Sequence, residues 1–286
     1  MKHAYLIMAH NEWELLNKLV NALDYPDNDI YLHIDKKSKF DKACIDIPKY
    51  SRIYYVKRRN VNWGGDSQIK CILEMLSTAY KQGYSYYHLL SGVDVPIEPQ
   101  ETIHKFFEEN NGKNYLSFDF SQNYAEMRLE QYHLFQNLIG RNKGHLVAIV
   151  YGIEKFLLDF QKKIGLNRIK KSNMTFYKGG EWFSITNELV VELLHSKKLI
   201  KKYFYKTIGA DELFLQTIAC NGALSDTVID NDLRCIDWKR GNPYIFRKED
   251  YKFICNSGKL FARKFSSKTD RVIIDQLYAR LSDSKQ

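Results

Sequence analysis

Short apolar runs and apolar residues at helical spacing alternate along the first 120 residues of the chain. Five runs rich in aliphatic and aromatic residues predict strands at residues 5–9, 30–34, 52–56, 86–90 and 115–118. Between them, helical spacing predicts helices at residues 11–23, 67–80 and 102–109. Strands and helices in this order are typical of a parallel sheet with helices on both faces, so we predict an α/β fold.

The second half of the chain has a different pattern. Helical spacing dominates between residues 120 and 175, where two interpretations stay open: a helix packed on the sheet, and a helix lying on a membrane surface. Further on, the pattern predicts a strand at residues 179–186 and helices at residues 187–194 and 210–218. The chain has neither internal repeats nor a low-complexity linker. We therefore predict a single domain over residues 1–286, with a nucleotide-binding half (1–120) and an acceptor-side and catalytic half (121–286).

Polar residues follow three of the predicted strands. They are His10 and Asn11, the run from Asp35 to Lys37, and the run from Ser91 to Asp94. Ligands of parallel α/β sheets bind beyond the carboxyl ends of the strands. The three clusters together therefore predict a ligand site at one edge of the sheet.

Charge narrows the range of partners. The chain has 43 Lys and Arg against 34 Asp and Glu, a net charge of +9. A basic protein favours phosphate-bearing partners such as nucleotides, nucleic acid or an anionic membrane, although a solvated basic face is an equal alternative. The sequence has no helix-turn-helix, RNA-recognition or zinc-finger pattern, so we do not expect nucleic acid as a partner.

Cysteine usage and hydropathy bear on the compartment. The five cysteines, at positions 44, 71, 220, 235 and 255, form no CxxC pair and indicate neither a zinc site nor a disulfide framework. The longest apolar runs fall short of the ~20 residues that a spanning helix needs. We therefore predict a reducing, cytoplasmic setting, with the inner face of the membrane as a further possible location.

Several common catalytic motifs are missing from the sequence. It contains no P-loop, GxGxxG, HExxH or GxSxG string. Two Asp-x-Asp strings, at residues 27–29 and 230–232, could hold a divalent ion on a diphosphate, but their positions favour turns. We therefore expect no metal and no other cofactor. Cationic side chains would then neutralise a bound diphosphate, and the candidates are Arg240, Arg247, Arg263 and Lys264.

Glu212 is the leading candidate for a general base. It lies beside Asp211 in the first turn of the helix predicted at residues 210–218. Transfer of a sugar to a hydroxyl group needs one carboxylate to accept the hydroxyl proton. The alternative is an acidic residue that merely stabilises the helix N-terminus.

Seven strings occur in the order found in a known family. They are HAYLIMAH (residues 3–10), YLHIDKK (31–37), NWGG with Ser67 (62–67), YHLLSGVDVPI (87–97), GEWFSIT (180–186), DELF (211–214) and LFARKF (260–265). Together they resemble the core-2/I-branching enzyme family, which includes β-1,6-N-acetylglucosaminyltransferases and peptide xylosyltransferases. The resemblance runs from residue 4 to about 270 and is poor between residues 120 and 175.

The resemblance implies a GT-A-type nucleotide-sugar transferase fold with a Rossmann-like, mostly parallel sheet, and an inverting, metal-independent reaction. It implies Glu212 as catalytic base and Lys264 as a contact of the donor diphosphate. For the arginine partner we choose Arg240, with Arg247 in reserve. The other donor-binding candidates by resemblance are His10, Asp35, Trp63 and Asp94, and the acceptor-binding candidates are Glu181 and Trp182.

The resemblance also implies the partners. The donor is expected to be a UDP-sugar, with UDP-GlcNAc first and UDP-xylose second, and the acceptor a glycan or a lipid-linked oligosaccharide. Unlike the animal enzymes, this chain shows neither a membrane anchor nor several disulfides, which suits a bacterial cytoplasmic enzyme with peripheral membrane contact. A non-catalytic sugar-binding module, using its many aromatic residues, is the alternative.

Overall fold

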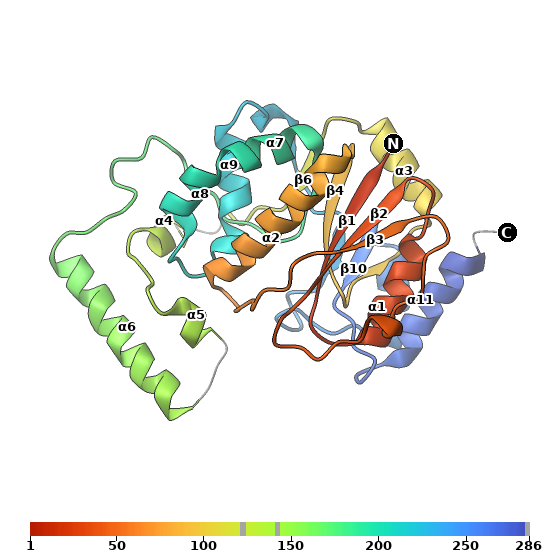
Figure 1. The fold of residues 1–286 in the computed structure, drawn as a ribbon, viewed down its shortest axis with the longest axis horizontal. Helices are drawn as coiled ribbons and strands as arrows, with labels where there is room; N and C mark the ends of the chain where they lie inside the picture. Colours follow the sequence, from red (N-terminus) through yellow and green to blue (C-terminus); the bar gives the residue numbers. More distant parts are fainter. Residues whose placement is uncertain (121–123, 141–143, 284–286) are drawn as a thin grey trace.

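A seven-stranded sheet forms the centre of the computed structural model, which describes residues 1–120, 124–140 and 144–283 (Figure 1). The strands lie in the order β3-β2-β1-β4-β7-β6-β8. Their bounds are β1 His3–Ala9, β2 Asn28–Ile34, β3 Arg52–Tyr55, β4 Tyr86–Ser91, β6 Asn114–Leu116, β7 Ser184–Thr186 and β8 Val228–Asp230. Both predicted halves of the chain therefore contribute strands to one sheet. The division between residues 120 and 121 stays a prediction, and residue 121 lies outside the described residues.

Six of these seven strands run in the same direction. β1 pairs in parallel with β2 and with β4, and β2 pairs in parallel with β3. β7 lies antiparallel between β4 and β6, and β8 runs parallel to β6. The predicted α/β fold with a mostly parallel sheet is confirmed. The strand predicted at residues 179–186 is shorter than expected, because Gly179 makes only an isolated bridge to Phe118 before β7 begins.

Helices cover both faces of the sheet (Figure 1). Alternate residues of β1 point to opposite faces of the sheet and pack against different helices. Tyr5 and Ile7 are buried with residues of α1 and α3, whereas Ala4 and Leu6 are buried with residues of α2, α7 and α9. A strand buried on both faces reads as a continuous apolar run, which is why the sequence pattern predicts it. The bounds are α1 Trp13–Leu23, α2 Asp66–Ala79, α3 Gln100–Glu109, α7 Asn187–His195, α8 Lys197–Phe204 and α9 Phe214–Asn221.

A second, three-stranded sheet lies beside the first. It has the order β5-β10-β9, with β5 Val95–Pro96, β9 Arg234–Ile236 and β10 Phe261–Arg263. α10 (Tyr251–Cys255) and α11 (Arg271–Asp283) share its apolar core. β9 and β10 are parallel, and Ile236 pairs with Arg263. The chain therefore leaves both strands at the same edge, where Asp237 and Lys264 follow. Five 3-10 turns complete the described structure: η1 Lys42–Cys44, η2 Tyr80–Gln82, η3 Ala210–Glu212, η4 Ser225–Thr227 and η5 Lys248–Asp250.

The segment after β6 departs most from the central architecture. It contains α4 (Tyr124–Leu129), α5 (Gln136–Ile139) and α6 (His145–Lys163). Figure 1 shows α6 standing away from the sheet, next to α5. The expectation of a helix here is confirmed, but the interpretation that it packs on the sheet is wrong. Residues 141–143, just before α6, lie outside the described residues. Among the described helices, none has the length and apolar content to cross a bilayer.

Candidate active site

The loops that follow β1 and β2 meet at the carboxyl edge of the sheet, as predicted. The backbone N–H of Asp35 donates to the carbonyl of Ala9 at 2.9 Å, and the Ser38 hydroxyl donates to the carbonyl of His10 at 2.6 Å. After β4, the N–H of Gly92 donates to Met8 at 2.9 Å. The three polar clusters of the sequence are therefore neighbours, because parallel strands in register end together.

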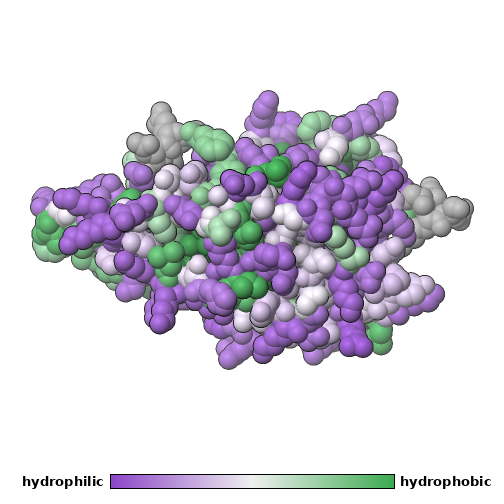
Figure 2. Space-filling model, turned by 90° about the horizontal axis from the view of Figure 1, so that it is seen from above, coloured by the Kyte–Doolittle hydropathy of each residue, from purple (hydrophilic) through white to green (hydrophobic). Residues whose placement is uncertain are grey.

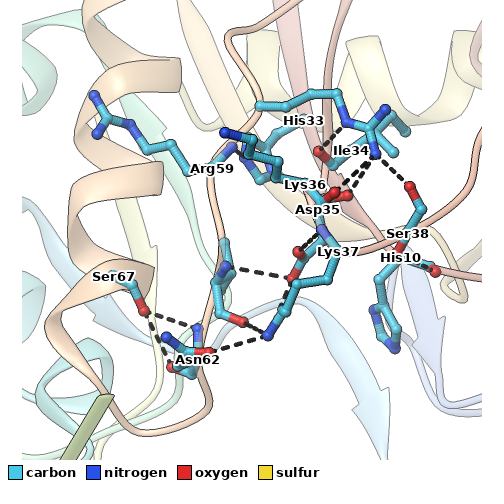
Figure 3. A network of polar contacts seen from close by, with 12 residues as sticks. His10, His33, Ile34, Asp35, Lys36, Lys37, Ser38, Arg59, Asn62 and Ser67 are labelled. Atoms are coloured by element: carbon cyan, nitrogen blue, oxygen red, sulfur yellow. Dashed lines mark hydrogen bonds and ion pairs between the residues drawn. The ribbon is translucent and has the colours of Figure 1, made fainter. Parts of the chain in front are cut away.

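Asp35 makes several polar contacts at this edge of the sheet (Figure 3). Its carboxylate accepts the backbone N–H groups of Lys37 at 2.8 Å and Val61 at 3.3 Å. The Lys37 ammonium lies 3.7 Å from the same carboxylate and donates to Asn62 Oδ1 at 3.0 Å. The guanidinium of Arg58 donates to the Asp35 carbonyl at 2.8 Å. Asp35 thus joins the end of β2 to the loop before α2, the loop that also contains Trp63.

The segment that contains Lys264 lies against the loop after β1, because the Ser266 hydroxyl donates to the Glu12 carboxylate at 2.8 Å. Burial lowers the pKa of His10, the charge of Lys264 lowers it further, and Asp35 opposes them. These charges act on the imidazole only over short distances. The structure therefore brings together three of the predicted donor-binding residues, and the lysine comes from the far end of the chain.

Asp94 is enclosed in its own loop. Its carboxylate accepts the Ser91 N–H at 2.8 Å and the Ser91 hydroxyl at 2.6 Å, and it lies 3.3 Å from Arg263 Nη1. The Arg263 guanidinium lies 3.7 Å from the centre of the Trp182 ring, within the range of a cation–π interaction. Asp94 is fully buried and Trp182 nearly so, so both side chains contact Arg263 more than solvent.

Three neighbouring carboxyl groups belong to Glu181, Asp211 and Glu212. Gln68 Nε2 donates to Glu181 at 3.3 Å and to Asp211 at 3.2 Å. Burial raises the pKa of Glu181 to about 7, against the lowering effect of Arg263 and of Gln68, while the charge of Glu212 adds to the rise. Burial, together with the charges of Glu181 and Glu212, raises the pKa of Asp211 well above its ordinary value. Asp211 is buried and Glu181 is partly buried, so these neighbouring carboxyl groups are costly to ionise together and their affinity for a proton is raised.

Glu212 is partly accessible, with 38% of its side chain exposed. Its Oε2 lies 2.7 Å from Arg128 Nη1, and its carbonyl accepts the N–H of Gly179 at 2.8 Å. It lies in the 3-10 turn η3, not in the first turn of an α-helix, because Leu213 leaves helical geometry before α9 begins. The helix predicted at residues 210–218 is thus wrong in its first four residues. Helix-dipole stabilisation, the alternative role for Glu212, has less support in this geometry.

A left-handed glycine fixes the turn that contains Glu212. Gly209 has φ +60°, and a Cβ there would lie 2.7 Å from Arg128 Nη1. Its N–H donates to the Gly64 carbonyl at 2.8 Å. Glycine therefore permits both the backbone conformation and the close approach of Arg128. The contact with Gly64 also brings the half-exposed Trp63, another predicted donor-binding residue, to the turn of Glu212.

Arg240 and Arg247 lie in the loop after β9. The Arg240 guanidinium pairs with Asp237 at 2.6 Å and with Asp250 at 2.8 Å, and it stacks 4.1 Å from the Tyr244 ring centre. The backbone N–H of Arg247 donates to Asp250 at 2.9 Å. This loop runs beside Lys264, whose carbonyl accepts the N–H of Phe246 at 3.0 Å.

The two Asp-x-Asp strings have structural partners at the edges of the sheet. Asp29 accepts the Arg52 N–H and the Tyr84 hydroxyl at the start of β2. Asp230 accepts the Phe118 N–H at the end of β8, and Asp232 accepts the Arg234 N–H just before β9. Within residues 1–120, 124–140 and 144–283, no group of three or more His, Cys, Asp and Glu side chains has a geometry suited to a metal ion.

Comparison with known proteins identifies the family of this chain. The family model described as Core-2/I-Branching enzyme matches residues 3–263, which is most of the chain. The chain belongs to the core-2/I-branching enzyme family. This is a family of glycosyltransferases, and the resemblance of the seven sequence strings is confirmed. The mostly parallel sheet agrees with the GT-A-type fold expected of a member.

Curated relatives of this family member are distant in sequence. Xylosyltransferase 2 of Homo sapiens is 20% identical over 96% of this chain and 33% of its own length. Xylosyltransferase 1 of Homo sapiens is 21% identical over 96% of this chain and 30% of its length. The xylosyltransferase of Ciona intestinalis is 19% identical over 97% and 34%. The chain thus spans about a third of the length of the curated relatives it matches.

Two residues of this site escape the sequence reasoning. Arg128 pairs with Glu212 but lies in the segment where the resemblance is poor, and no motif marks it. Gln68 bridges Glu181 and Asp211 from α2. It directly follows the NWGG string and Ser67, which is the one signal in the sequence that points toward it.

Proposed function

We propose that this chain is an inverting glycosyltransferase that moves a sugar from a UDP-sugar to a hydroxyl group of a glycan acceptor. Family membership supports the reaction class. One observation carries the assignment of residues: Gln68 donates to both Glu181 and Asp211, which precedes Glu212, and the ring centre of the adjacent Trp182 lies 3.7 Å from the guanidinium of Arg263, which precedes Lys264. The candidate base and the cations around Lys264 are therefore on two sides of one site.

Glu212 acts as the general base in this proposal. Its carboxylate takes the proton of the acceptor hydroxyl, and the hydroxyl oxygen forms a bond to the anomeric carbon of the donor. The bond between that carbon and the diphosphate oxygen breaks, and UDP leaves with the electron pair. Attack from the face opposite UDP inverts the anomeric centre. The ion pair with Arg128 supports the role by holding the carboxylate in one orientation.

Lys264 neutralises the charge that develops on the diphosphate. Its position near His10 and Asp35, at the carboxyl edge of the sheet, supports this role. Arg240 is the second cation and Arg247 the reserve. Arg240 would have to turn from Asp237 and Asp250 toward the phosphates, so we assign Lys264 the larger share. Such preorganised charge is often the largest contribution to catalysis, and the proposal requires no metal ion and no other cofactor.

UDP-GlcNAc is the first candidate donor and UDP-xylose the second. The three relatives named above are xylosyltransferases, which favours the second. The proposed acceptor is a glycan or a lipid-linked oligosaccharide, with Glu181 and Trp182 on the acceptor side.

A panel of UDP-sugars with glycan acceptors tests the proposal. We expect transfer from one donor, with an inverted linkage assigned by nuclear magnetic resonance. Sugar binding without transfer or hydrolysis of any donor would instead favour a non-catalytic sugar-binding module.

A further inference from the structure

α6 carries apolar residues on a face exposed to solvent as well as on its half-buried face toward the protein. Leu146, Ile149, Ile153, Phe156 and Phe160 recur at helical spacing and are between 46% and 79% exposed. We call these five residues the α6 stripe. A surface helix normally turns its apolar stripe toward the protein core, whereas this stripe faces solvent.

The opposite face of α6 is held to the protein by polar contacts. The side chain of Gln161 bonds both the N–H and the carbonyl of Tyr132, at 2.8 and 3.0 Å. Glu154 accepts the Phe135 N–H at 3.2 Å. Both anchoring side chains are buried, so the orientation of the helix is fixed with the α6 stripe outward. Figure 2 shows hydrophobic residues at this end of the molecule, bordered by hydrophilic ones.

Basic residues surround the C-terminal end of α6. Arg168 donates to the carbonyls of Lys202 and Tyr203, at 3.0 and 2.8 Å, and so ties the segment after α6 to the end of α8. Residues 145–206 contain twelve Lys or Arg against five Asp or Glu, so most of the net charge of the chain lies in this region. The exposed lysines here are Lys155, Lys162, Lys163, Lys170, Lys171, Lys197, Lys198, Lys201, Lys202 and Lys206.

We propose that the α6 stripe docks on a lipid surface with anionic headgroups. Interfacial helices insert an apolar face into the headgroup boundary and add electrostatic attraction from nearby lysines. The α6 stripe lies on a helix that stands away from the sheet (Figure 1). Its five side chains expose on the order of 600 Å², less than the ~800 Å² per partner of a stable protein interface. A bilayer surface needs no matching groove, which favours lipid over a second copy of the chain.

Vesicle co-sedimentation of the full chain tests this docking. Phosphatidylcholine vesicles containing phosphatidylglycerol should bind the chain, phosphatidylcholine alone should bind it more weakly, and added salt should reduce the difference. The double variant Ile149→Glu, Phe156→Glu should weaken binding to the mixed vesicles at least about tenfold, because it places charge in the inserted face. The matched control is Ile47→Glu, Phe253→Glu, which changes an exposed isoleucine and phenylalanine elsewhere and should bind like the wild type.

Unchanged circular dichroism and thermal unfolding would show that both double variants fold. The proposal is overturned if the wild type ignores both kinds of vesicle, or if the stripe variant binds as well as the wild type. Light scattering gives a third outcome. A dimer that the stripe variant alone converts to a monomer would assign the stripe to a second copy of the chain. None of these results depends on transferase activity, so the docking and the proposed function can fail separately.

Discussion

The two sides of the candidate site are built in different ways. On the donor side, His10 and Asp35 follow adjacent parallel strands, and backbone hydrogen bonds hold their loops. On the base side, Gln68, Arg128 and Glu212 come from segments far apart in the sequence and meet only through tertiary packing. The donor side is set by sheet topology, whereas the base side keeps carboxyl groups partly out of water at a cost in stability. We therefore expect substitutions on the donor side to weaken UDP binding, and substitutions on the base side to change turnover or the pH dependence of stability.

The largest expected effect is on the base side. Glu212→Gln should lower kcat by about 10²–10⁴-fold while leaving UDP affinity unchanged, because it removes the proton acceptor and no donor contact. Steady-state kinetics and calorimetric UDP binding measure the two quantities. Glu249→Gln, at an exposed position in η5, is the matched control. Near-normal turnover of the Glu212 variant would remove this residue from the mechanism.

The next effect is on the donor side. Lys264→Ala should weaken UDP binding by about 10–100-fold, since a charge-assisted hydrogen bond contributes about 1.5–3 kcal/mol. Calorimetry measures the loss, and Lys268→Ala, at an exposed lysine nearby, serves as control. Equal UDP affinity of the two variants would contradict the proposed diphosphate contact and would separate Lys264 from the donor side.

A smaller effect concerns stability and pH. The pKa of Glu181 rises from 4.5 to about 7 on folding. The folded state therefore binds more protons than the unfolded state between these values, and the wild type loses stability as pH rises through this window. Gln cannot titrate, so the free energy of unfolding of Glu181→Gln relative to wild type should increase by up to about 3 kcal/mol from acidic pH to about pH 8.

Urea unfolding at several pH values measures this difference. A constant offset between Glu181→Gln and wild type across the whole range would mean that the carboxyl pair does not hold a proton. The carboxyl groups of the base side would then have no pH-dependent cost in stability, although the hydrogen bonds from Gln68 would remain.

The smallest expected effect is that of a chelator. EDTA should leave the initial rate of transfer unchanged, because the proposal assigns diphosphate neutralisation to Lys264 and Arg240. Rates with EDTA and with added Mn²⁺ give the comparison. Loss of activity that Mn²⁺ restores would show that a metal ion shares the donor side with these cations.

Sequence reasoning predicts the donor side better than the base side. Buried parallel strands have a clear apolar pattern, so the ends of β1, β2 and β4 and their polar loops follow from the sequence alone. The contact between Glu212 and Arg128 does not follow, because the pair joins residues 84 positions apart without a local pattern. The exposure of the α6 stripe also escapes prediction. Helical periodicity reveals that an apolar stripe exists, but not whether it faces the core.

A structure of the Glu212→Gln variant with a bound UDP-sugar tests the central claim most directly. The account predicts that the diphosphate contacts Lys264 and that the anomeric carbon lies next to residue 212, with room for an acceptor hydroxyl between them. A donor bound elsewhere, or one whose anomeric carbon points away from residue 212, would contradict it.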